Sequence, residues 1–351
     1  MRKILLIQLV TVILVAVGLH EKIFSQELKK EDLFFQSSLH YTCRGMAYWY
    51  DKANGGLEIV TEIPYSRLDC QNCHTPSCDT CHKTIIEGRP SYSKKAARNQ
   101  EMCLKCHKRE DSILKIDKDT NHENVHIAKG MQCMDCHTAR QMHGDGVEYK
   151  SMKQKGAMDT GCEKCHKSIN PSVSHKVHGE RLDCKACHVR HVLSCSNCHF
   201  ETLIKKGKRV SIPLSGWVFL INYNGKITSA NMQNFVVPGN KTFLMFAPQN
   251  SHSIMKEGRK CDNCHGTEIV GQIQKGRLSL TWFENGNLKH LRGVIPVVSG
   301  VTYESVYQNY KDGKWIPIEK PPVPRLQYAG FGDPLSKEQL NKLSQPMGKS
   351  E

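Results

Sequence analysis

The sequence predicts a mainly α-helical and irregular fold with little regular secondary structure, plus a small β-rich C-terminal region. Hydrophobic residues make up only 39% of the 351 residues, too little to fill a large aliphatic core. The chain holds 17 cysteines and 18 histidines, far above ordinary usage. Sequences typical of hairpin turns gather after residue 200. The cysteines and aromatic residues also argue against a disordered chain.

The net charge is strongly positive. Lys and Arg number 49 against 34 Asp and Glu, which gives +15 at neutral pH. Such an excess predicts an anionic partner, such as nucleic acid, a membrane surface or an acidic protein, or an anionic cofactor carried inside.

The N-terminus resembles an export signal. Arg2 and Lys3 precede an apolar run over residues 4–19, and polar sequence follows. Residues 1–25 are therefore predicted to be a signal peptide that is cleaved or a signal anchor that is retained. Either alternative places the remainder in the periplasm or elsewhere outside the cytoplasm, in the second case held at the membrane by residues 4–19. Export argues against a nucleic-acid partner.

The cysteines follow one pattern. Sixteen of them form eight Cys-x-x-Cys pairs, and a histidine directly follows every pair. This is the attachment signature of haem c, in which two thiols bond the porphyrin and the histidine is the proximal iron ligand. The predicted attachment residues are Cys70, Cys73, Cys78, Cys81, Cys103, Cys106, Cys133, Cys136, Cys162, Cys165, Cys184, Cys187, Cys195, Cys198, Cys261 and Cys264. The predicted proximal ligands are His74, His82, His107, His137, His166, His188, His199 and His265.

Other uses of Cys-x-x-Cys explain this pattern less well. Zinc ribbons and disulfide frameworks do not require a histidine after every pair. Thioredoxin-like pairs need a βαβ context, which is not apparent here. We therefore expect eight covalently attached haems that pack the interior, with about sixteen propionates offsetting most of the positive charge.

The spacing of the motifs suggests three segments after the signal. Residues 26–200 form a seven-haem region, residues 201–320 a β-rich region carrying the eighth haem, and residues 321–351 a Pro-rich tail with a short terminal helix. The β-rich region is predicted to be either a docking surface or structural filler.

Local signals predict individual turns and one helix start. Asn224-Gly225, Asn285-Gly286 and Asp312-Gly313 are typical of hairpin turns. Ser336 followed by Gln339 is typical of a capping box.

The histidines outside the motifs nearly match the number of expected irons, which favours a second histidine ligand at most sites. The candidate distal ligands are His40, His122, His126, His143, His175, His178, His191 and His252. His122 and His126 have helical i, i+4 spacing, and His175 and His178 have i, i+3 spacing. His290 follows a predicted turn and is expected at the surface.

The stretch from His122 to His199 resembles a known family. Its blocks His126-Ile-Ala-Lys-Gly-Met-Gln-Cys133, Met142-His143-Gly144-Asp145-Gly146 and His175-Lys-Val-His178 are similar to those of octahaem cytochromes related to tetrathionate reductase and, more distantly, hydroxylamine oxidoreductase. The resemblance covers about a quarter of the chain and extends to the number of haems. In that wider group, active sites often replace the motif histidine by lysine or add a tyrosine crosslink. All eight motifs here end in histidine, which favours electron transfer over catalysis.

Cys43 is the cysteine outside the pattern. The adjacent Arg44 would favour a thiolate, so Cys43 is a candidate catalytic residue that could ligate iron or act on a sulfur compound. The alternatives are an inert thiol or an intermolecular disulfide.

Together these features predict an extracytoplasmic octahaem c-type cytochrome that passes electrons along mostly bis-histidine haems. Its expected partners are a membrane protein that oxidises quinol and a downstream reductase or surface acceptor. The alternative is a reductase of a small sulfur or nitrogen oxyanion at one specialised haem, with that anion as an additional partner. A filament-forming cytochrome is a third hypothesis.

Overall fold

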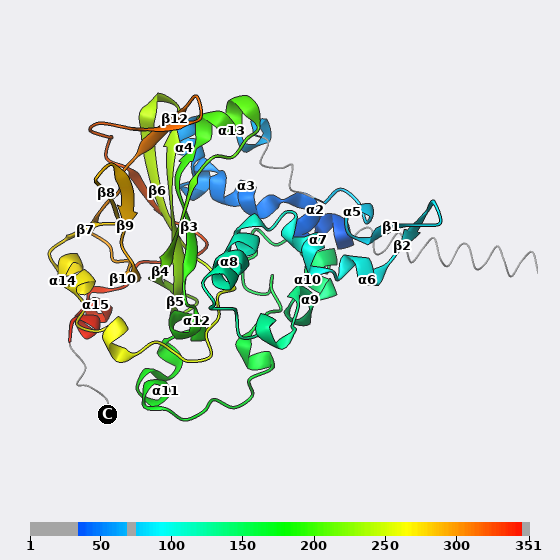
Figure 1. The fold of residues 1–351 in the computed structure, drawn as a ribbon, viewed down its shortest axis with the longest axis horizontal. Coiled ribbons are helices and arrows are strands. Elements are labelled where there is room, and N and C mark those ends of the chain that lie inside the picture. Colours follow the sequence, from blue (N-terminus) through cyan, green and yellow to red (C-terminus); the bar gives the residue numbers. More distant parts are fainter. Residues whose placement is uncertain (1–33, 69–74, 346–351) are drawn as a thin grey trace, which may run out of the picture.

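The computed structural model describes residues 34–68 and 75–345 (Figure 1). The predicted signal and Cys70, Cys73 and His74 of the first motif lie outside the described residues. Within the described ranges, no helix combines the length and apolar character that crossing a bilayer requires.

Most helices are short, and they alternate with turns through the first half of the chain (Figure 1). They are α2 Leu39–Thr42, α3 Arg44–Tyr50, α4 Glu58–Thr61, α5 Asp79–His82, α6 Lys94–Ala97, α7 Gln100–Leu104, α8 Lys108–Asp119, α9 Cys133–Cys136, α10 Ala139–His143, α11 Val173–His178, α12 Cys184–His188, α13 Phe200–Lys206, α14 Glu268–Gln274 and α15 Lys337–Ser344. Short 3₁₀ turns include Cys162–Lys164 and Cys261–Asn263.

The strands lie mainly in the second half. They are β1 Lys83–Ile86, β2 Arg89–Tyr92, β3 Val192–His199, β4 Ile212–Tyr223, β5 Lys226–Val237, β6 Lys241–Pro248, β7 Arg277–Ser279, β8 Thr281–Glu284, β9 Asn287–His290, β10 Gly293–Pro296, β11 Thr302–Glu304, β12 Gln308–Lys311, β13 Lys314–Pro317 and β14 Arg325–Tyr328.

One six-stranded sheet organises the molecule. Its strand order is β10-β4-β3-β5-β6-β14, and four small two-stranded sheets accompany it. β4 pairs antiparallel with β5, and β5 pairs antiparallel with β6, as hairpin connections require. The two edge strands, β10 and β14, pair parallel with their neighbours and come from much later in the chain.

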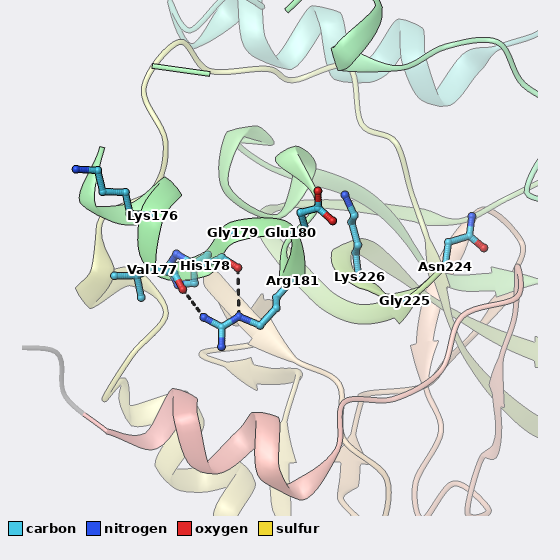
Figure 2. Close-up of a pocket in the computed structure, with 9 residues that line it drawn as sticks. All are labelled: Lys176, Val177, His178, Gly179, Glu180, Arg181, Asn224, Gly225 and Lys226. Carbon is cyan, nitrogen blue, oxygen red and sulfur yellow. Dashed lines mark hydrogen bonds between the residues drawn. The ribbon is translucent and has the colours of Figure 1, made fainter. Parts of the chain in front are cut away.

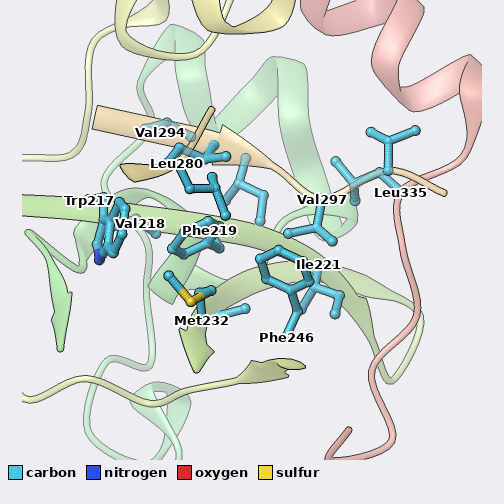
Figure 3. Packing of buried hydrophobic residues seen from close by; sticks show 14 of the residues in the cluster. Trp217, Val218, Phe219, Ile221, Met232, Phe246, Leu280, Val294, Val297 and Leu335 are labelled. Atoms are coloured by element: carbon cyan, nitrogen blue, oxygen red, sulfur yellow. The ribbon is translucent and has the colours of Figure 1, made fainter. Parts of the chain in front are cut away.

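The main hydrophobic core lies around β4. Five consecutive residues, from Trp217 to Ile221, are buried, so protein covers both faces of this strand. Phe246 of β6 packs against Phe219 with ring centres 5.3 Å apart and meets Tyr303 edge-on at 5.0 Å. Figure 3 shows Phe219 and Phe246 in one cluster with Val294 of β10, Val297 and Leu335.

The predicted fold class is wrong. A large curled sheet with its own aliphatic and aromatic core replaces the expected helical, irregular fold with little regular secondary structure. The overall hydrophobic fraction is low, but the apolar residues are concentrated in a few strands, such as Ile212–Tyr223. That local concentration is enough to form a core without any cofactor.

The local turn predictions are confirmed. Asn224 and Gly225 have φ of 51° and 76° and join β4 to β5, which is the left-handed geometry that an Asn-Gly turn supplies. The β8–β9 and β12–β13 hairpins turn at the predicted Asn-Gly and Asp-Gly pairs. The capping box at Ser336 and Gln339 opens α15.

Truncating Phe246 tests the sheet core. Phe246→Ala should lower the free energy of unfolding by about 3–5 kcal/mol, because the cavity would be surrounded by residues that cannot collapse into it. The matched control is Phe283→Ala on β8, where the ring is 39% exposed and the expected change is within about 0.5 kcal/mol. Denaturant unfolding followed by circular dichroism measures both, and equal losses would contradict this core assignment.

Candidate functional site

Six of the described Cys-x-x-Cys-His motifs share one backbone conformation. We name each motif by its first cysteine. In five, the histidine N–H donates to the carbonyl oxygen of the first cysteine at 2.9–3.0 Å; these are the Cys78, Cys103, Cys133, Cys162 and Cys261 motifs. The Cys184 motif forms α12. One helical turn places residues three apart on the same side, so each pair of thiols can reach one ligand.

Each of these six motif histidines lies close to a histidine from elsewhere in the chain. The ring centres are 5.9–6.3 Å apart in all six pairs. The pairs are His82–His143, His107–His40, His137–His252, His166–His126, His188–His175 and His265–His178.

This separation fits two imidazoles that bind opposite sides of one metal ion. A bond from a first-row metal to imidazole nitrogen is about 2 Å long, and the ring centre lies about 1 Å behind that nitrogen. Two coaxial ligands therefore have ring centres about 6 Å apart. Rings in direct stacking contact can lie closer, so packing alone does not require this recurring value.

The hydrogen bonds of several paired histidines leave the metal-binding nitrogen available. Nδ1 of His175 donates to the Asn170 carbonyl at 2.8 Å, and Nδ1 of His265 donates to the Lys342 carbonyl at 3.0 Å. His137, His178 and His188 also use Nδ1, toward Gln141, Ser174 and Met255 respectively. An imidazole that donates from Nδ1 carries its lone pair on Nε2, which is the usual arrangement of a metal-binding histidine.

Burial favours the neutral form of four paired histidines. It lowers the pKa of His40, His126, His137 and His252, and the neutral imidazole is the form that binds metals. In the part of the chain that the structure describes, no group of three or more His, Cys, Asp or Glu could hold a metal by itself. Two protein ligands per site match a haem iron, whose other four ligands belong to the porphyrin.

The six motifs adjoin one another in chain order. A thiol of each motif lies close enough to a thiol of the next to shift its pKa, and the five thiol pairs are Cys81–Cys103, Cys103–Cys133, Cys136–Cys165, Cys162–Cys184 and Cys187–Cys261. The pairs therefore form a continuous series of neighbouring sites.

In two of these five thiol pairs, a hydrogen bond joins the thiols. The bond to Cys133 lowers the pKa of Cys103 to about 7 and raises the pKa of Cys133. The bond to Cys162 lowers the pKa of Cys184 to about 6 and raises the pKa of Cys162. Two thiols in such contact belong to motifs that lie directly against each other.

A surface pocket lies beside one pair. Its volume is about 490 Å³, within the range of small-molecule sites, and His178 lines it together with Lys176, Arg181 and Lys226 (Figure 2). Arg181 Nε donates to the His178 carbonyl at 3.2 Å, which connects the C-terminal end of α11 to the 3₁₀ turn that follows. The basic lining suits carboxylate groups of a ligand.

Two polar side chains position paired histidines, and sequence reasoning did not identify either. Asn124 accepts a hydrogen bond from the His126 N–H at 2.7 Å and donates to the His252 carbonyl, so one amide fixes two ligands. Gln141 contacts His137 Nδ1 at 3.1 Å and closes the capping box of α10 with Thr138. The Thr-x-x-Gln spacing after His137 is a signal that could have identified Gln141, whereas nothing in the sequence marks Asn124.

Among the described histidines outside the Cys-x-x-Cys-His motifs, three belong to no pair. His191 is buried and its Nε2 lies 2.9 Å from Asp117 Oδ1, and His290 contacts the Ser215 carbonyl through Nε2 at 2.7 Å. His290, expected at the surface, is half-buried against Trp217. His122 is exposed, and the predicted helical spacing with His126 is wrong because the segment between them is not helical.

The Cys195 motif differs from the other six. It lies within β3, and His199 Nε2 is 2.5 Å from Asn309 Oδ1. The structure brings no second histidine of the described residues to the His199 ring, which instead lies beside the Tyr310 ring, with ring centres 6.2 Å apart.

Cys43 occupies the junction between α2 and α3. Its φ is 48°, and its Sγ lies 3.7 Å from the sulfur of Met46. The neighbouring Arg44 forms an ion pair with Glu148 at 2.9 Å. A catalytic role for Cys43 stays a prediction.

Removing His191 should affect stability rather than ligation. His191→Ala leaves the buried carboxylate of Asp117 without one of its donors, which should cost about 1–3 kcal/mol of unfolding free energy. His122→Ala, at an exposed histidine, should change stability by no more than about 0.5 kcal/mol. Denaturant unfolding measures the difference. A changed visible spectrum in His191→Ala would instead indicate that His191 binds an iron.

The ion pair between Arg140 and Asp159 should make the stability of the folded chain depend on pH in the acid range. Hydrogen bonds from Arg140 and then Thr138 lower the pKa of Asp159 to about 2. The carboxylate therefore stabilises the folded chain above pH about 4, and this contribution disappears as the pH falls towards 2. Asp159→Asn should cost about 1 kcal/mol at pH 7, after allowance for solvent screening, and nothing near pH 2. Unfolding titrations across this range test the prediction, and a difference independent of pH would contradict it.

The comparisons with known proteins give no name to this arrangement: no family model, no curated protein and no solved structure matches the chain.

Proposed function

We propose that this chain is an extracytoplasmic multihaem c-type cytochrome that transfers electrons through a series of bis-histidine haems. The observation that carries the proposal is the set of six imidazole pairs, each made of one motif histidine and one remote histidine 5.9–6.3 Å away. Each pair also lies beside a turn that presents two thiols on one side.

The series of sites has the form that electron transfer requires. From Cys81 to Cys261, each motif has a thiol that shifts the pKa of a thiol in a neighbouring motif, so cofactors held at these motifs would be neighbours. Figure 1 shows α5, which carries the first described motif, and α14, which follows the last one, on opposite sides of the molecule. Electrons could therefore enter at one side and leave at the other.

The haem iron would supply the redox chemistry, by cycling between its ferric and ferrous states. The chain's own residues have three tasks in this proposal. The turns of the motifs would hold the porphyrin, and the paired histidines would bind the iron through Nε2 and keep substrates away from it. Carbonyl acceptors such as Lys342 O and Met255 O fix the imidazole planes.

Basic side chains close to the sites would balance the haem propionates. Burial first, and then the nearby charges of Lys185 and Arg109, lower the pKa of Lys153 to about 8. Arg259 is half-buried near the thiols of Cys264 and Cys187. An anionic cofactor would favour the charged form of such side chains and would offset part of the +15 charge.

The proposed electron donor is a membrane protein that oxidises quinol, and the proposed acceptor is a reductase or a surface acceptor. The export-type N-terminal sequence supports both partners, because it favours a location outside the cytoplasm.

Replacing one paired histidine tests the ligation. His175→Ala should convert one low-spin ferric haem to a high-spin form, because His188 would keep the iron with an open sixth position. His122→Ala is the matched control, since both side chains are exposed and only His175 belongs to a pair. Electron paramagnetic resonance of the full-length oxidised protein, expressed with the haem c attachment machinery, measures the change.

The wild-type spectrum separates the hypotheses. Low-spin signals alone support electron transfer. A high-spin haem in the wild type would instead favour the reductase of a small sulfur or nitrogen oxyanion. Absence of covalently bound haem would overturn the proposal.

A further inference from the structure

We infer that the Cys195 motif is not a haem attachment site and that Cys195, Cys198 and His199 instead form part of the central sheet. The inference rests on the proposed function, because it concerns which of the motifs of a haem protein carry haem. It corrects the count of eight that the sequence predicts.

The backbone of this motif is extended where the other six described motifs turn. β3 runs between β4 and β5 and pairs with both: Cys195 lies opposite Pro213 and Gln233, and Cys198 lies opposite Phe235. The His199 N–H donates to the Val210 carbonyl at 2.9 Å, and not to the carbonyl of Cys195. An extended chain advances about 3.3 Å per residue against 1.5 Å in a helix, so the two thiols are not gathered over a single turn.

A register shift in β3 does not restore the site. It lies between the two cysteines, where Asn197 has φ of 52°, and it places both cysteines opposite alternate residues of β5. They therefore share a face of the sheet, but protein already covers this region. Cys198 is 6% exposed and His199 4%, whereas the cysteines of the other six described motifs are exposed or half-exposed.

Asn197, between the two cysteines, is also held by hydrogen bonds. Asn197 is fully buried, its N–H donates to Asn234 Oδ1 at 2.6 Å, and its own Oδ1 accepts from the Gln308 N–H at 3.0 Å. A porphyrin placed over this segment would have to displace β12, which would break the bond from Gln308. Buried polar groups left without partners would each cost about 1–3 kcal/mol.

The histidine of the motif has a different use. Its Nε2, the atom that binds iron in a haem c motif, is engaged with Asn309 of β12 at 2.5 Å. His137, His188 and His265 show the opposite arrangement, because each forms a hydrogen bond through Nδ1. The same five-residue pattern thus serves as a strand that fastens β12 to the sheet.

Peptide mapping of the wild-type holoprotein tests the inference without a variant. Trypsin should release residues 191–205, which contain Cys195 and Cys198, and residues 261–275, which contain Cys261 and Cys264, because Lys or Arg bounds both peptides. After reduction and alkylation, the first peptide should carry two alkyl groups and no haem. The second should carry one haem and no alkyl group, and it is the internal control.

The outcomes distinguish the inference from the proposed function. Haem on both peptides would overturn the inference and leave the function intact, whereas haem on neither would overturn the function. Paired variants give a second readout: replacing Cys261 and Cys264 by Ser should lower the haem content by one per chain, and replacing Cys195 and Cys198 by Ser should leave it unchanged. Loss of one haem in the second variant would contradict the inference even if stability also fell.

Discussion

The pairing of histidine rings about 6 Å apart connects distant parts of this structure, and this is the distance that two imidazoles would keep on either side of one iron in the proposed function. Each of six motif histidines has such a partner ring, which comes from elsewhere in the chain. His107 meets His40, and His137 meets His252, more than a hundred residues further along the chain. These pairs join short helices of the first half of the chain, which contributes few residues to the main hydrophobic core, so ligation at the pairs would add to the stability of this region.

The sheet supplies what the paired histidines cannot. After β6, the chain continues into a buried segment in which the Ser251 hydroxyl donates to the His191 carbonyl at 2.7 Å and Ser253 donates to Asp117 at 2.8 Å. His252 lies between these two serines, so hydrogen bonds of both neighbours fix the position of this partner of His137. Asp117 belongs to α8 and His191 immediately precedes β3. The buried carboxylate of Asp117 thereby connects α8 to the start of β3 and to the segment that holds His252.

Sequence reasoning reached local features and missed distant ones for a physical reason. Asn-Gly turns and a Ser-x-x-Gln box act within a few residues, so their hairpins and cap could be predicted. The parallel pairing of β10 with β4 depends on packing between distant segments, and no local pattern records it. The same applies to ligand assignment: His126 and His178 precede the Cys133 and Cys184 motifs closely, but each pairs with a later motif, at His166 and His265.

The Cys195 motif shows why a motif is a necessary condition for a site and not a sufficient one. Its residue pattern is that of the other motifs, but the preceding residues, Val192 and Leu193, are buried and belong to β3. Strand formation satisfies the backbone donors and acceptors of the segment on both sides, through β4 and β5. A haem turn at the same place would return those groups to water or leave them buried without partners. Where flanking residues favour a central strand, the sheet and the cofactor compete for one segment, and in this structure the sheet holds it.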